Sequence, residues 1–168
     1  MRLPQCTAIS TGSKKRIQEH LDRGWREVGI RQTFSGKFAP VVSEELEPRA
    51  RKHYADIDFG FTGRLWRDPH IPRDFAKAET RKFILECPDD RFFAHRDGFA
   101  IVTRTGHLMT VDLVASLDHQ AFRILSHAAR KLGTRFAQAG TYEDNERAIR
   151  LYKRMGLRLV KKELVLHK

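Results

Sequence analysis

The sequence predicts an α/β protein with a mixed, mostly antiparallel sheet flanked by helices. First, residues 91–116 contain three strand-like runs separated by turns at Asp97-Gly98 and Thr105-Gly106, which is typical of an antiparallel meander. Second, the run 118–132 repeats apolar residues at helical spacing on one face. Third, the chain ends in a strand, a helix and a strand. With 168 residues, 40% of them hydrophobic, the chain is long enough for one well-buried core.

The N-terminal part predicts a helix followed by a strand. Ser13 precedes a run with Ile17 and Leu21 at helical spacing, and Gly24 ends it. Residues 25–34 then favour a strand. We divide the chain here, with residues 1–38 as a partial N-terminal repeat or extension and residues 39–168 as the main domain. The repeat is suggested by a short echo, in which Gly24 aligned with Gly156 brings similar helix-Gly-strand segments together.

The middle of the chain predicts two helices joined by a loop. We expect a helix over 43–54, capped by Ser43 and shortened or kinked by Pro48. Residues 60–72 contain Gly and Pro and favour a loop. A second helix is expected from Arg73 to Glu86, because Cys87-Pro88 would end it.

The C-terminal part predicts four further elements. Asp118 is expected to cap the helix that ends at Gly133. A buried strand is expected over 134–140, then a helix over 144–155 and a final strand over 157–167.

The charge of +11 indicates an anionic partner or merely solvated surfaces. The basic residues are spread along the chain, whereas a nucleic-acid-binding arm usually concentrates them, so we do not expect nucleic acid as the partner. Cys6 and Cys87 are too few for a disulfide framework, and no run is apolar enough for a membrane span. We therefore expect a cytoplasmic protein without a membrane partner.

The helix predicted over 144–155 carries the most informative pattern. Asn145 lies at its start and Tyr152 follows seven residues later, two turns on, so both side chains lie on the same side. A polar anchor and an acidic hydroxyl could thus line one extended ligand. The alternative is that Asn145 caps the helix and Tyr152 is a core aromatic residue with a solvated tip.

The pattern Asn145-x-x-Ala148-x-x-Leu151-Tyr152-x-x-x-Gly156-Leu157 resembles the C-terminal motif of the GNAT superfamily of N-acyltransferases. The resemblance covers roughly residues 43–168. More narrowly, the strings "RDPHIPRDFA", "VDL" and "GTYEDN" resemble the branch that acetylates nucleotide-linked amino sugars, the dTDP-fucosamine acetyltransferase type. The resemblance implies a sheet with one splayed pair of strands and acetyl-CoA as co-substrate.

The resemblance also implies roles for particular residues. Tyr152 would be the acid for the departing thiolate, and Asn145 would contact the pantetheine arm. Backbone amides of the central strand would face the thioester, and the loop before "DPHIP" would lie on the acceptor side. These two segments contribute Leu113, Val114, Ala115, Trp66 and Arg67.

Asp112, in the same central strand, is a second catalytic candidate. Its carboxylate could take a proton from the substrate amine through a water molecule. It could equally be an ordinary polar residue on the open face of the sheet.

The sequence departs from the family pattern where the cofactor pyrophosphate would bind. The family has a Gly-rich loop there, but residues 114–131 contain no glycine, so the loop is expected to be degenerate or deleted. The helix start could still offer amides, with His119 and Arg123 as further donors, although Asp118 would repel phosphates. Otherwise the site is vestigial.

The remaining site classes are not favoured. The histidines show no metal-ligand spacing with Cys6, Cys87 or the carboxylates, and no nucleophile elbow occurs. The leading hypothesis is an N-acetyltransferase for a small amine, such as a nucleotide-linked amino sugar. The alternatives are a degenerate, non-catalytic binding module and a basic nucleic-acid-binding protein. A second copy of the chain is a further candidate partner, as a homodimer.

Overall fold

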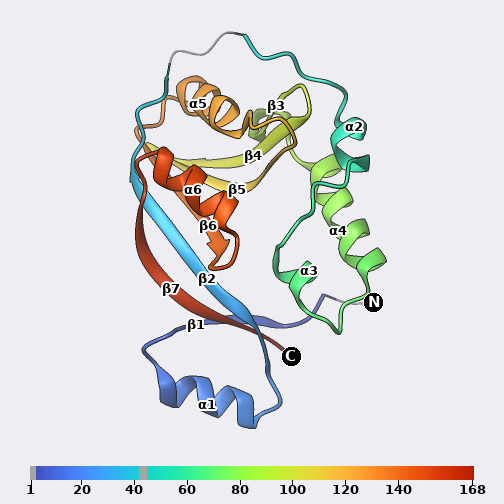
Figure 1. The fold of residues 1–168 in the computed structure, drawn as a ribbon, viewed down its shortest axis with the longest axis vertical. Helices are drawn as coiled ribbons and strands as arrows, with labels where there is room; N and C mark the ends of the chain where they lie inside the picture. Colours follow the sequence, from blue (N-terminus) through green and yellow to red (C-terminus); the bar gives the residue numbers. More distant parts are fainter. Residues whose placement is uncertain (1–2, 42–44) are drawn as a thin grey trace.

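The computed structural model describes residues 3–41 and 45–168, which form one seven-stranded sheet flanked by helices (Figure 1). The strand order is β1-β7-β2-β6-β5-β4-β3. The strands are β1 Cys6–Ser10, β2 Arg26–Lys37, β3 Phe92–His95, β4 Gly98–Thr105, β5 Leu108–Ser116, β6 Phe136–Tyr142 and β7 Arg158–His167. The helices are α1 Lys14–Asp22, α2 Arg51–Asp56, α3 Arg64–Arg67, α4 Arg73–Glu86, α5 Ala121–Leu132 and α6 Glu146–Arg154, with a 3₁₀ turn at Asp89–Arg91.

The predicted fold class is confirmed. Every strand pair in the sheet is antiparallel except β5 with β6, which is parallel. The meander β3–β4–β5 forms with the two expected turns, where Arg96 (φ 50°) and Gly106 (φ 59°) adopt positive φ.

Two core clusters pack helices against the sheet. One joins α5 and α6 to β2, β4, β5 and β6 and contains Phe34, Ile124 and Tyr152. The other joins α2 and α4 to β3 and β4 around Tyr54 and Phe99, both fully buried. The first cluster positions α5 and α6, which carry the predicted site residues Arg123 and Tyr152.

The chain contains two β-α-β units that match with a shift of 132 positions. Helix α1 (14–22) and helix α6 (146–154) have the same length, and Gly24 and Gly156 follow them with φ of 80° and 82°. The register is symmetric under the same shift, because Arg31 pairs with Glu163 and the pair Arg26–His167 matches Ser35–Arg158.

The last strands of the two units are exchanged. β1 pairs with β7 of the other unit, and β6 pairs with β2. Residues 26–37 therefore lie inside the common sheet, between β6 and β7. Whether residues 1–38 are a partial repeat in origin stays a proposal.

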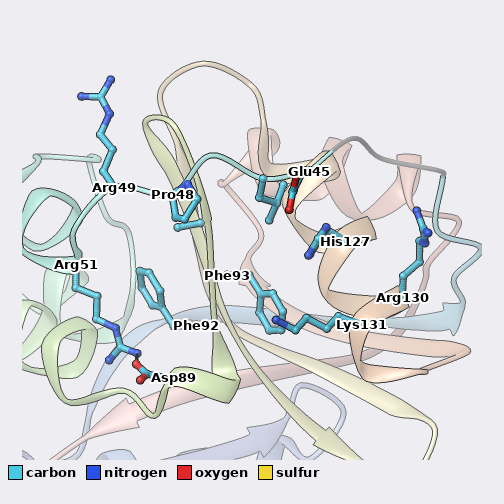
Figure 2. Close-up of a pocket in the computed structure, with 12 residues that line it drawn as sticks. Glu45, Pro48, Arg49, Arg51, Asp89, Phe92, Phe93, His127, Arg130 and Lys131 are labelled. Atoms are coloured by element: carbon cyan, nitrogen blue, oxygen red, sulfur yellow. Dashed lines mark hydrogen bonds and ion pairs between the residues drawn. The ribbon is translucent and has the colours of Figure 1, made fainter.

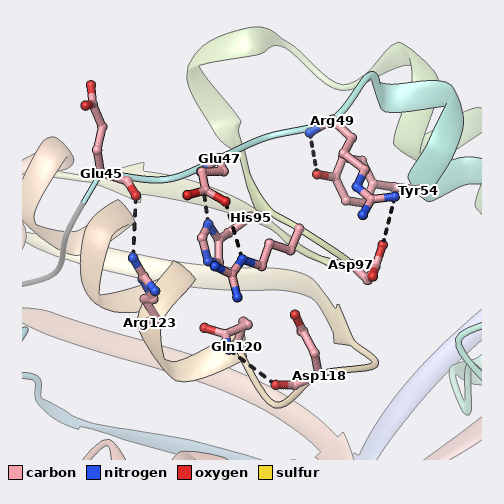
Figure 3. Close-up of polar contacts among 10 residues, drawn as sticks. Glu45, Glu47, Arg49, Tyr54, His95, Asp97, Asp118, Gln120 and Arg123 are labelled. Carbon is pink, nitrogen blue, oxygen red and sulfur yellow. Dashed lines mark hydrogen bonds and ion pairs between the residues drawn. The ribbon is translucent and has the colours of Figure 1, made fainter.

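The helix predicted over 43–54 is wrong in its first half. Residues 42–44, including the proposed cap Ser43, lie outside the described residues, and 45–50 are not helical. Pro48 disfavours the helical conformation in the residue before it, Glu47. The Glu47 carbonyl instead accepts a hydrogen bond from the Arg96 amide (2.9 Å). The Glu47 amide donates one to Nδ1 of the His95 ring (2.9 Å), which Figure 3 shows.

Two smaller predictions also differ from the structure. Asp118 does not cap α5, because the helix begins at Ala121 and the Asp118 carboxylate accepts a hydrogen bond from Ser116 Oγ (2.8 Å). The loop predicted over 60–72 contains the single helical turn α3, which the Gly63 carbonyl opens by accepting from the Trp66 amide (2.9 Å).

Candidate functional site

The candidate site lies where β5 and β6 stop pairing. Their parallel ladder runs from Leu108 with Phe136 to Val111 with Ala139 and goes no further within the described residues. β5 also carries a bulge at this point, since Leu113 and Val111 pair with consecutive residues of β4 and Asp112 between them has no partner there. The β6-facing edge of β5 beyond Val111 is therefore left without a strand partner.

The bulge decides which way the predicted backbone contacts of β5 face. Leu113 and Ala115 pack against the Tyr54 cluster, whereas Val114 packs against the Phe34 cluster with α5 and α6. Residues 113–115 thus line both layers at the unpaired part of the strand.

Tyr152, on α6, belongs to the core cluster that also contains Val111 and Ala139, the last paired residues of β5 and β6. Its ring is 5.8 Å from the ring of Phe34, and the residue is 3% exposed. Burial raises the pKa of its hydroxyl to about 12, so it is a neutral proton donor at pH 7. Within the described part of the chain that hydroxyl has no hydrogen-bond partner. An unpaired, partly desolvated hydroxyl is suited to donate a proton to a ligand atom.

Asn145 caps α6. Its Oδ1 accepts a hydrogen bond from the Ala148 amide (3.2 Å), and its Nδ2 donates to Thr62 Oγ1 (3.0 Å). The side chain therefore joins the start of α6 to the loop before α3. The capping role weighed from the sequence is observed, and the contact with a pantetheine arm stays a prediction.

Arg147 crosses the mouth of the opening. This residue lies in the first turn of α6, and its Nη2 donates to the carbonyl of Ser116, the last residue of β5. Arg154 follows two turns later on the same face of α6. Its guanidinium lies 4.6 Å from the centre of the Phe122 ring on α5. Sequence reasoning missed both arginines. Their seven-residue spacing, equal to that between Asn145 and Tyr152, was the available signal.

The start of α5 is where the pyrophosphate loop would lie in the family. Four residues join β5 to α5, and Ser116 Oγ accepts a hydrogen bond from the Gln120 amide (2.9 Å). His119 is exposed and has a positive φ of 61°. Arg123 Nη2 donates to the Glu45 carbonyl (3.5 Å), which ties α5 to residues 45–50 (Figure 3).

The predicted base Asp112 is already engaged. Its Oδ2 lies 3.0 Å from Arg91 Nη2 and accepts a hydrogen bond from Thr103 Oγ1 (2.6 Å). Accepting a proton from a substrate would require loss of the ion pair with Arg91. The contacts of Asp112 thus point toward the 3₁₀ turn and β4.

The two predicted acceptor-side residues take different positions. Arg67 forms a two-pronged ion pair with Asp144 (2.8 and 2.7 Å) and lies 4.5 Å from the centre of the Tyr142 ring, so it reaches the turn between β6 and α6. Trp66 instead donates its indole N–H to Thr80 Oγ1 on α4 (3.0 Å). The structure therefore brings Arg67 near Asn145 but turns Trp66 toward α4.

Within residues 3–41 and 45–168 no three His, Cys, Asp or Glu side chains gather in a way that could hold a metal ion. In the same ranges, every helix is too short or too polar to span a bilayer.

Comparisons with known proteins give structural neighbours only. No family model matches the chain, and no curated protein matches it. A GCN5-related N-acetyltransferase from Sphaerobacter thermophilus aligns with 97% of the chain at a TM-score of 0.57 and 14% identity. A functionally unknown conserved protein from Staphylococcus epidermidis aligns with 96% at 0.65 and 12% identity. A tandem GNAT protein from the clavulanic acid biosynthesis pathway aligns with 97% at 0.53 and 10% identity.

The neighbours are longer than this chain, which covers 58%, 69% and 62% of their respective lengths. At such identities the likeness concerns the fold and leaves the activity open. The sheet order, the single parallel pair and the helices beside it agree with that likeness. The chain has the fold of the GNAT N-acetyltransferases.

Proposed function

We propose that the protein transfers an acetyl group from acetyl-CoA to an amino group of a small molecule. The observation that supports this best is the position of Tyr152, whose pKa burial raises to about 12 and which shares a core cluster with Val111 and Ala139, the last paired residues of β5 and β6. A thioester in that opening would have its sulfur within the reach of a proton donor, as acyl transfer requires. The unpaired edge of β5 would supply amides for the developing oxyanion.

The remaining roles follow from position. Arg147, at the mouth of the opening, would exchange its hydrogen bond with the Ser116 carbonyl for the phosphates of the co-substrate. His119 and Arg123, at the start of α5, are the next donors along that side. Arg67 and the loop before it would face the acceptor amine. A nucleotide-linked amino sugar remains our proposed acceptor, because the chain is strongly basic.

A second candidate function is a non-catalytic binding module with the same fold. It is favoured by the glycine-free connection from β5 to α5 and by the engagement of Asn145 in capping and in the bond to Thr62. In that case the opening would not accept a pantetheine arm.

Calorimetric titration of acetyl-CoA into the wild-type protein and into Tyr152→Phe separates the two. For an acetyltransferase we expect binding in both and turnover about 10²-fold lower in Tyr152→Phe, with amino-sugar nucleotides as acceptors. Absence of heat with millimolar acetyl-CoA would contradict the acetyltransferase proposal and leave the binding module. Circular dichroism of the variant controls for folding.

A further inference from the structure

A cavity of about 800 Å³ lies at the outer edge of β3, the last strand of the sheet. Figure 2 shows that its lining side chains come from both sides of that strand. Phe93, His127 and Lys131 gather on the α5 side, while Phe92 and Arg51 lie on the other side. β3 is separated from β5 by β4, so the cavity is distinct from the opening beside Tyr152.

The cations on the two sides of the cavity differ in their partners. Arg51 donates to the Cys87 carbonyl and pairs with Asp89, and Arg49 pairs with Asp97 at 3.5 Å. These charges are satisfied within the protein, so they have little to offer a ligand.

The cations on the α5 side are unmatched. Arg130 and Lys131 are exposed, and in the described part of the chain neither has an ion-pair partner. Burial, followed by the charges of Lys131 and Arg130, lowers the pKa of His127, so this ring is neutral at pH 7 and has one N–H to donate. Among the described residues of the lining, Glu45 is the single carboxylate on that side.

The geometry of α5 directs these groups into one place. Positions 127, 130 and 131 have the i, i+3 and i+4 spacing that puts side chains on one helix face. The His127 ring lies 6.4 Å from the Phe93 ring, and Leu46 and Pro48 add apolar surface to the same lining. Cations thus border an apolar wall made by Phe93, Leu46 and Pro48.

We propose that this cavity binds a small phosphorylated molecule with a flat apolar body, of the nucleoside diphosphate class. Arg130 and Lys131 hold the phosphates, His127 donates its N–H, and the base packs against Phe93 and Leu46. The volume of about 800 Å³ covers both sides of β3, and the proposed ligand would occupy the α5 side of it. This site does not depend on the acetyltransferase proposal.

The test is calorimetry with ADP as the probe, with acetyl-CoA titrated separately. We expect ADP to bind the wild-type protein and to bind Arg130→Glu/Lys131→Glu at least about tenfold more weakly. Lys14→Glu/Lys15→Glu is the matched control, because it changes the net charge equally on α1, far along the sheet, and should alter ADP affinity less than about twofold. The ring-proton resonances of His127 should shift on ADP addition in the wild-type protein.

Several outcomes would overturn the site. Equal weakening in both charge-reversal variants would show that the overall field attracts ADP. Pyrophosphate binding as tightly as ADP would remove the role of the apolar wall, and competition by acetyl-CoA would place ADP in the β5–β6 opening. No binding with millimolar ADP, or much tighter binding of an eight-residue oligothymidylate than of ADP, would also contradict the proposal.

Discussion

Arg31 Nη2 lies 2.9 Å from Glu163 Oε2, and the two residues hold the same position in the two matching β-α-β units. Their pair marks the centre of the exchanged strands β2 and β7. The Glu163 side chain is 9% exposed and also lies 2.8 Å from Lys161 Nζ. Burial alone would raise the pKa of this carboxyl, but the hydrogen bonds from Lys161 and Arg31 outweigh it and lower the pKa below its ordinary 4.5.

The substitution Glu163→Gln should destabilise the protein at pH 7 by about 1.5–3 kcal/mol, since it removes charge-assisted hydrogen bonds from a buried position. The lowered pKa means that Glu163 stabilises the fold above pH 4.5 and that this contribution is lost as the pH falls through the folded-state pKa. The measurement is urea unfolding of wild type and variant at pH 7 and at pH 3. If the difference in unfolding free energy between wild type and variant did not shrink at pH 3, the ionic origin of this stabilisation would be contradicted.

Asp68→Asn should loosen the segment between α3 and α4 from β7. Asp68 Oδ2 accepts from His167 Nδ1 at 2.8 Å, and both residues are buried. The loss of a hydrogen bond to a buried carboxylate costs about 1.5–3 kcal/mol. Unfolding by urea should show this loss, and hydrogen exchange should show faster exchange of amides near Asp68. Arg26→Gln is the control, because Arg26 lies 3.6 Å from Asp68 but is half exposed, and its effect should be far smaller.

The fold could be predicted from local signals where these agree with packing. Helix α4 has the predicted ends because Pro72 and Pro88 flank it, and the meander has the predicted turns because their residues favour tight reversals. Residues 45–50 were predicted only in part. Pro48 indicated a break in the helix, but the contacts of Glu47 with His95 and Arg96, which are distant in sequence, do not follow from the local pattern. Long-range contacts of this kind leave no local periodicity.

The candidate site was predicted unevenly for the same reason. The pattern that singled out Asn145 and Tyr152 is a spacing along one helix, and in the structure Asn145 is the N-cap of α6 and Tyr152 lies within it. Their roles toward a ligand stay predictions. The engagement of Asp112 by Arg91 depends on a bulge and on a 3₁₀ turn, neither of which the sequence pattern specifies. Arg147 donates a hydrogen bond to the carbonyl of Ser116 at the end of β5. This contact joins two elements, so the pattern along α6 does not show it.

Gly29→Ala should destabilise the sheet where it meets Arg67. Gly29 has φ of 152°, which side chains rarely adopt, and a Cβ there would lie 3.1 Å from Arg67 Nε and 3.1 Å from Tyr142 Cδ1. We expect a loss of about 1–3 kcal/mol from strain and overpacking. Thermal unfolding measures it, with Gly63→Ala as the control because a Cβ there meets nothing within 4 Å. If both variants were equally stable, the side chains of Arg67 and Tyr142 could move to accept the added Cβ without cost, and the prediction would be wrong.

Arg147→Ala should weaken acetyl-CoA binding about tenfold if Arg147 holds the phosphates of the co-substrate. The side chain is exposed, so the melting temperature should hardly change. Arg150→Ala is the matched control, since Arg150 lies on the same helix and pairs with the exposed Glu146. Acetylpantetheine, which lacks the pyrophosphate, distinguishes the reasons for a loss. If Arg147 contacts the phosphates, affinity for acetylpantetheine should be equal in wild type and variant. If both ligands lose affinity alike, Arg147 acts by shaping the β5–β6 opening through Ser116, and the phosphates are held elsewhere.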